Sequence, residues 1–144
     1  MHRLAIREGW STFFLAATLV LTATLSIQRA NWADGLSILV PVALAGLATG
    51  LVLASARRIP SALAHLLALA VGSVVVLYQM TTFLDDALGG WGDKLAFLWL
   101  RWNGWIGAVV EGRRADDLYL FVLLMAVLVW TLSYITVWVV FRSG

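Results

Sequence analysis

The residue best able to do chemistry is His65, the one histidine inside a long apolar run of this 144-residue chain. A histidine within a membrane helix can relay protons or contact a ligand. It can equally hydrogen-bond a neighbouring helix or reach the interface. No second histidine or carboxylate shares its helical face, so the spacing predicts no metal site. We keep His65 as a weak functional candidate.

Two adjacent carboxylates, Asp85 and Asp86, follow the same apolar run. Paired carboxylates can act as general acid and base. Sequence neighbours on a helix, however, point about 100° apart, and this pair stands where a helix normally ends in solvent. Cysteine is absent, and no phosphate loop, nucleophile elbow or dinucleotide fingerprint is present. We therefore predict no catalytic residue and no cofactor, and that the chain is not an enzyme.

Small residues recur at a spacing of four in two apolar runs. Gly46 and Gly50 form a GxxxG pattern, and Ala64, Ala68 and Gly72 repeat the spacing further along. Small residues on one helix face let two helices approach closely and gain van der Waals contact. The pattern predicts packing within this chain, or a face for a partner protein.

An aromatic stripe, Trp130, Tyr134 and Trp138, runs along one face of the last apolar segment, with Phe141 nearby. Such a stripe could hold a pigment, a quinone or a lipid tail. More commonly it faces lipid or packs on a neighbouring helix. We group it with the small residues as a helix-packing or partner surface.

The composition of the chain predicts the solvent environment of these residues. Hydrophobic residues make up 62% of the chain and charged residues only 12%, against roughly 25% charged in an ordinary soluble domain. The mean hydropathy is +0.91. The net charge is only +2 and the basic residues are scattered, which argues against nucleic acid as a partner. The lipid bilayer is the expected environment.

Four apolar runs are long enough to cross a bilayer, whose hydrocarbon core of about 30 Å needs about 20 helical residues. A central charge would cost roughly 2.5–3.5 kcal/mol on insertion scales, and apart from the titratable His65 these runs carry none. Asp116 and Asp117 stand at the start of the last run, where a helix N-terminus favours negative charge. The predicted spans, within a single membrane domain over residues 1–144, are 9–28, 35–56, 59–84 and 118–141.

A fifth helix is predicted over residues 93–110, after the break at Gly89-Gly90. Asp93 can cap its start. Its tryptophans prefer the headgroup layer; they are Trp99, Trp102 and Trp105. A fifth span would bury Lys94 and Arg101, so an interfacial or re-entrant helix is favoured. The predicted fold class is an all-α membrane protein with four transmembrane helices and one such Trp-rich helix.

Basic residues predict the orientation. Arg3 and Arg7 precede the first span and Arg57 and Arg58 follow the second, whereas only Arg29 lies between these spans. The positive-inside rule then places the N-terminus in the cytoplasm. Four spans return the C-terminus to the same side.

A set of mainly tryptophan, glycine and proline positions is dispersed along nearly the whole chain: Arg7-Glu8-Gly9-Trp10, Trp32, Gly35-Leu36, Pro41, Gly46, Gly50, Pro60, His65, Gly72, Arg101-Trp102, Trp105, Gly112, Asp116-Asp117, Trp130, Tyr134, Trp138 and Phe141-Arg142. Together these positions resemble the N-terminal membrane region of bacterial transglutaminase-like membrane proteins, especially those of the Chloroflexi kind. The resemblance implies the bacterial cytoplasmic membrane, further helices, and an extracytoplasmic domain with catalytic Cys, His and Asp. No such residue can be carried over, because this chain has no cysteine and stops at Gly144.

Taken together, the sequence predicts a non-catalytic membrane-anchoring or scaffold module, either part of a transglutaminase-like protein or a short relative without the enzyme. Its expected partners are the bilayer and other membrane helices or subunits. One alternative is an accessory or structural subunit of a larger membrane complex. Another is a transporter or channel component, for which the spans offer only His65, Gln79 and several hydroxyls as a polar path.

Overall fold

The computed structural model describes residues 3–56, 58–114 and 116–142, with side chains described from Gly9 onward. Every regular element in these ranges is helical, which confirms the all-α prediction. Arg57 and the side chains of Arg3 and Arg7, on which the orientation prediction depends, lie outside the described part. The elements are α1 (Arg3–Ala30), η1 (Leu36–Ile38), α2 (Leu39–Ser55), α3 (Ser61–Phe83), η2 (Asp86–Leu88), α4 (Trp91–Val110) and α5 (Leu118–Arg142).

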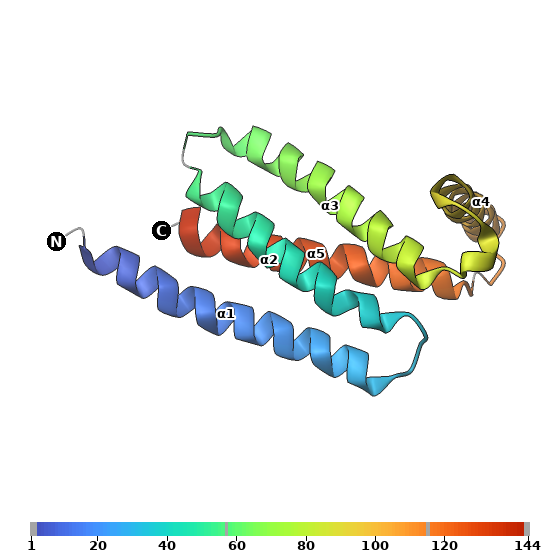
Figure 1. The fold of residues 1–144 in the computed structure, drawn as a ribbon, viewed down its shortest axis with the longest axis horizontal. Helices are drawn as coiled ribbons and strands as arrows, with labels where there is room; N and C mark the ends of the chain where they lie inside the picture. The colour runs from blue at the N-terminus through green and yellow to red at the C-terminus, as the bar shows by residue number, and fades with distance from the viewer. Residues whose placement is uncertain (1–2, 57, 115, 143–144) are drawn as a thin grey trace.

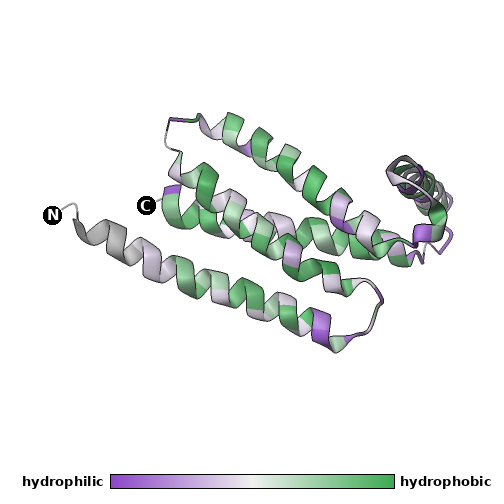
Figure 2. Ribbon diagram, in the orientation of Figure 1, coloured by the Kyte–Doolittle hydropathy of each residue, from purple (hydrophilic) through white to green (hydrophobic). Residues whose placement is uncertain are grey.

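Four helices are long and apolar enough to cross a membrane, as predicted: Gly9–Ala30, Leu36–Ser55, Ser61–Phe83 and Leu118–Arg142. They run side by side (Figure 1), and their residues are mainly hydrophobic along the length of each helix, with hydrophilic residues mostly towards the ends (Figure 2). The third helix begins at Ser61 because Pro60, with ψ 143°, is still extended. The protein is therefore a membrane protein with four candidate spans.

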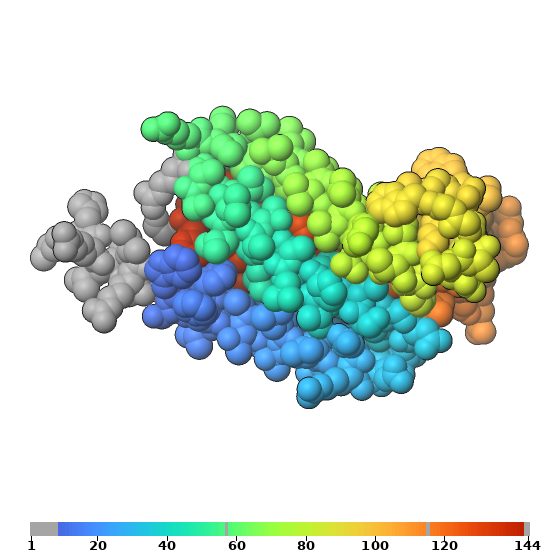
Figure 3. All heavy atoms as spheres, in the orientation of Figure 1, coloured from blue at the N-terminus to red at the C-terminus, as the bar shows by residue number. Residues whose placement is uncertain are grey.

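The remaining long helix, α4, lies across one end of this bundle. It is seen end-on in Figure 1, where the other four helices are seen from the side, and it forms a separate lobe beyond the bundle in the space-filling view of Figure 3. This placement confirms the prediction of a fifth helix outside the four candidate spans. It begins at Trp91 rather than Asp93, because Asp93 caps from within the first turn: its Oδ2 accepts a hydrogen bond from the Gly90 N–H at 3.0 Å.

The centre of the bundle is the pair α2 and α5, with α1 and α3 on its flanks. Leu39 and Val42 of α2 and Val122 and Ala126 of α5 are completely shielded from solvent. By contrast, the outer faces of α1 and α3 expose large apolar side chains such as Leu15 (74% exposed). Exposure of this kind fits helices that face lipid rather than water.

The turn between α1 and α2 is held against the end of α3. Gly35 has φ +86°, a left-handed conformation, and a Cβ at this position would stand 2.6 Å from the Phe83 ring. Only glycine fits both the backbone and the space. The ends of α1, α2 and α3 therefore meet at the α4 end of the bundle, opposite the end that carries the termini (Figure 1).

Candidate functional site

The GxxxG glycines lie where α2 meets α5. A Cβ at Gly46 would stand 2.8 Å from Ser133 Cβ and 3.1 Å from a backbone oxygen, and one at Gly50 would stand 2.9 Å from Val137 Cβ. Such distances leave no room for a side chain, so the two backbones approach closely at these points. We call this contact the α2–α5 interface.

The small residues of α3 face the aromatic stripe of α5. Ala64 and Ala68 pack with Tyr134 in one buried cluster. Gly72 lies directly under the indole of Trp130, which a Cβ would overlap. Trp130 and Tyr134 are each only 6% exposed. The aromatic stripe of α5 therefore packs against α3. Of the alternatives considered from the sequence, this is packing on a neighbouring helix.

His65, the histidine singled out from the sequence, lies at the termini end of the bundle. Its Nδ1 is 2.9 Å from Tyr134 Oη, and its ring centroid is 4.6 Å from that of Trp138. The Arg142 guanidinium lies over the Trp138 ring, with Cζ 4.7 Å from the ring centroid, and donates from Nη2 to the Ile59 carbonyl at 2.6 Å. These contacts tie the start of α3 to the end of α5. Within the described ranges, no three His, Cys, Asp or Glu residues gather as a metal site would require.

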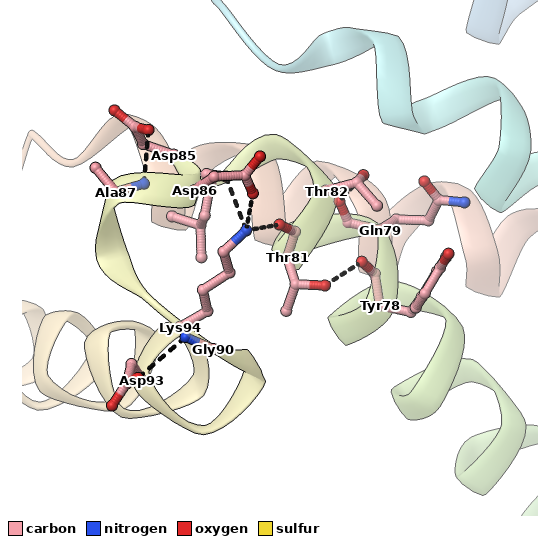
Figure 4. A network of polar contacts seen from close by, with 11 residues as sticks. Tyr78, Gln79, Thr81, Thr82, Asp85, Asp86, Ala87, Gly90, Asp93 and Lys94 are labelled. Atoms are coloured by element: carbon pink, nitrogen blue, oxygen red, sulfur yellow. Dashed lines mark hydrogen bonds and ion pairs between the residues drawn. The ribbon is translucent and has the colours of Figure 1, made fainter.

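The opposite end holds a polar contact that the sequence did not predict. Lys94 of α4 is only 7% exposed, and its Nζ donates to Asp86 Oδ1 at 2.8 Å, Thr81 O at 3.0 Å and Leu84 O at 3.2 Å (Figure 4). An ammonium has three donors, so all are used. The carbonyls at a helix C-terminus lack intrahelical partners and carry partial negative charge, which makes this a suitable place for a cation. We call this group of contacts the Lys94 clamp.

The adjacent carboxylates Asp85 and Asp86 have different partners, and only Asp86 takes part in the Lys94 clamp. The hydrogen bond and positive charge of Lys94 hold the pKa of Asp86 below its usual value of 3.8. Asp85 instead accepts a hydrogen bond from the Ala87 N–H at 3.0 Å. Both residues are exposed at a helix end, the placement favoured from sequence, and their different partners do not make an acid–base pair.

A second attachment joins α4 to the start of α5. The Arg101 guanidinium lies 5.0 Å from the ring centroids of both Phe97 and Tyr119, and Nη1 donates to Asp117 Oδ2 at 2.7 Å. The other oxygen of Asp117 accepts from the N–H groups of Tyr119 and Leu120 at 3.0 and 3.3 Å. Asp117 thus caps α5 and pairs with α4 at once. We call these contacts the Arg101 attachment.

Beside the Arg101 attachment lies an open groove between α4 and α5, which we call the α4–α5 groove. One part, of about 480 Å³, has Arg101, Arg114, Asp116 and Asp117 as its charged lining. An adjoining part, of about 550 Å³, shares Trp105, Asp116 and Asp117 and continues past apolar residues of α5. The groove combines charges at its rim with an apolar wall that runs along a candidate span.

Three tryptophans of α4, namely Trp99, Trp102 and Trp105, differ in their exposure and contacts. Trp99 is 66% exposed. Trp102 stacks on Trp105 with centroids 5.9 Å apart, and Trp105 lines the α4–α5 groove. The helix therefore has an exposed tryptophan and contributes another to the lining of the groove.

Comparisons of the chain with protein-family models, curated proteins and solved structures find no match. The fold and geometry define its class: a helical membrane protein with four candidate spans and a fifth helix fixed across one end of the bundle.

Proposed function

We propose that this chain is a membrane-anchoring scaffold module that holds α4 in one headgroup layer of the bilayer, where it supports partner subunits or an attached domain. The observation that carries this proposal is the combination of fixed position and exposed apolar surface in α4. The Lys94 clamp and the Arg101 attachment fasten it to α3 and α5, yet Trp99, Leu100 and Val110 are 66%, 71% and 81% exposed. A helix with apolar and charged faces suits the bilayer surface.

The hydrogen bonds and ion pairs of the titratable side chains favour a non-catalytic role. His65 is engaged by Tyr134, Asp86 by Lys94 and Asp117 by Arg101 and the α5 backbone. A general base needs a free lone pair directed at a substrate. The contacts of these three groups instead join them to side chains or backbone of other helices and turns.

The proposed location is the bacterial cytoplasmic membrane, with both termini in the cytoplasm and α4 on the outer side. The distribution of arginines in the sequence supports this orientation. The resemblance to bacterial membrane proteins supports the choice of membrane.

Single-cysteine labelling tests the orientation, because the chain has no cysteine of its own. Arg113→Cys places a thiol in the connection between α4 and α5, and Arg58→Cys places one between α2 and α3; both positions are exposed. A membrane-impermeant maleimide is expected to label residue 113 in intact spheroplasts and residue 58 only after permeabilisation. The reverse pattern would overturn the orientation, and labelling of both without permeabilisation would overturn the spanning arrangement.

Spin-label depth measurements test the position of α4. A nitroxide at Trp99→Cys is expected at headgroup depth. Leu69→Cys serves as the matched control, since Leu69 is 67% exposed on α3 and lies in a candidate span. If the label at position 99 were as deep as that at position 69, α4 would not be interfacial and the proposal would fail.

The resemblance to transglutaminase-like membrane proteins supports a particular cargo, namely an extracytoplasmic transglutaminase-like domain encoded beyond residue 144. The test is the downstream reading frame. A Cys, His and Asp domain there would support this cargo, whereas an immediate stop codon would leave separate partner subunits as the cargo.

A further inference from the structure

The α4–α5 groove has the features of a lipid site, and we infer that it binds a phospholipid whose headgroup carries both a phosphate and a primary ammonium, as phosphatidylethanolamine does. This inference goes beyond the proposed scaffold role. It rests on that proposal only in placing α4 at headgroup depth.

The charged lining of the groove contains one ion pair and two exposed charged residues outside that pair. Arg101 and Asp117 bind each other at 2.7 Å. Arg114 and Asp116 also line the groove and are exposed, and neither has an ion pair or hydrogen bond within the part of the chain that the structure describes. A guanidinium suits a phosphate through paired N–H donors. A carboxylate accepts hydrogen bonds from an ammonium.

The apolar wall of the groove offers a path for an acyl chain. Leu118, Phe121 and Leu124 line the second part of the groove and recur every three residues, which places them on one side of α5. They lead from the rim into the candidate span that begins at Leu118. Trp105 stands at the junction of the two parts, and tryptophan favours the boundary between headgroups and hydrocarbon.

The balance of charge selects the headgroup class. Two arginines and two aspartates give the lining no net charge, which suits a net-neutral headgroup. A choline headgroup has no N–H to donate to Asp116. An anionic glycerol headgroup has no cation to meet that carboxylate and adds negative charge beside two aspartates. The primary ammonium is the group that completes both contacts.

Native mass spectrometry of the full chain, delipidated in detergent, tests the inference. Phosphatidylethanolamine, phosphatidylcholine and phosphatidylglycerol with identical acyl chains are added separately. Because an exposed ion pair is weak, we expect about 2–5-fold higher occupancy for the ethanolamine lipid. Asp116→Asn should remove this preference and Asp116→Glu should retain it. Arg114→Gln should lower the occupancy of all three lipids.

Arg113→Gln is the matched control, because Arg113 lies in the same connection but pairs with Glu111 and does not line the groove. It should leave lipid occupancy unchanged. Equal occupancy of the three lipids, a preference for the glycerol lipid, or an ethanolamine preference that survives Asp116→Asn would each overturn the inference. Circular dichroism confirms that each variant remains folded. The depth of position 99 is measured separately, so failure here is distinguishable from failure of the scaffold proposal.

Discussion

The α2–α5 interface and the Lys94 clamp join helices by different means. At the α2–α5 interface, Gly46 and Gly50 bring two backbones together without a side chain between them. At the Lys94 clamp, one ammonium reaches three oxygens contributed by α3 and the turn after it. The first contact depends on shape and the second on charge.

The difference follows from the surroundings of each contact. Lipid is as apolar as the side chains, so helices inside a bilayer gain little by hiding apolar surface from it and associate through close packing. At the end of the bundle, water and headgroups make charges tolerable, and the free carbonyls of α3 attract a cation. A helix that lies across the bundle can therefore be attached by polar contacts that would be costly in the middle of a span.

The largest expected effect comes from filling the α2–α5 interface. The double variant Gly46→Ala with Gly50→Ala places two methyl groups 2.8 and 2.9 Å from α5 carbons, so the helices must separate. We expect a loss of about 2–6 kcal/mol in unfolding free energy, at about 1–3 kcal/mol for each overpacked site. Unfolding by a denaturing detergent, followed by circular dichroism, measures the loss.

The control for this variant is Gly107→Ala on α4, where an added Cβ has no neighbour within 4 Å. It should raise stability by up to about 1 kcal/mol, because alanine favours helix over glycine. A double variant as stable as the native chain would show that close approach does not hold α2 and α5 together.

An intermediate effect is expected from Lys94→Met, which keeps the length of the side chain and removes the ammonium. The buried carbonyls of Thr81 and Leu84 lose a charged donor, at a cost of about 2–3 kcal/mol in the local stability of α4. Hydrogen exchange of α4 amides should accelerate while that of α2 and α5 stays unchanged.

Arg113→Met provides the comparison for Lys94→Met, since the Arg113–Glu111 pair is exposed on both sides and should change stability by less than about 1 kcal/mol. Uniformly faster exchange across all helices in the Lys94 variant would mean that the clamp supports the whole bundle rather than α4 alone.

The smallest effect is a dependence of α4 attachment on pH. Lys94 lowers the pKa of Asp86 from 3.8, so the folded carboxylate releases its proton more readily than the unfolded one. The contribution of ionised Asp86 to the attachment of α4 is therefore complete above about pH 4. It is lost as the pH falls through the lower pKa that Asp86 has in the folded protein. The mobility of a spin label at Trp99→Cys should rise over that acidic range, and Asp86→Asn should remove the pH dependence. A rise centred near pH 6 would point to another group.

Much of the architecture could be predicted because hydropathy is a local property of the sequence. The four apolar runs became α1, α2, α3 and α5 with ends within a few residues of those predicted. Aspartates ahead of the last run predicted the start of α5, and Asp117 does cap it. The mixture of tryptophan and charge in residues 93–110 predicted a helix that stays out of the bundle.

The contacts between residues of different helices could not be predicted from hydropathy in the same way. Small residues predicted that helices would approach closely, but not that Gly46 would face Ser133 or that Gly72 would lie under Trp130. Lys94 appeared only as a charge that disfavoured a fifth span, and nothing local indicated that it would be buried against the end of α3. The α4–α5 groove likewise joins residues of α4 to the connection that follows it and to α5.

By itself, the sequence determined which four segments are apolar enough to cross lipid, and it predicted a further Trp-rich helix outside those spans, since both depend on the transfer of individual side chains out of water. Only the tertiary structure decided which helix faces which, that Lys94 fastens α4, and that Arg114 and Asp116 share a groove without a partner among the described residues. The reason is that these relations depend on shape and on distances between residues far apart in the chain, and no local preference specifies them.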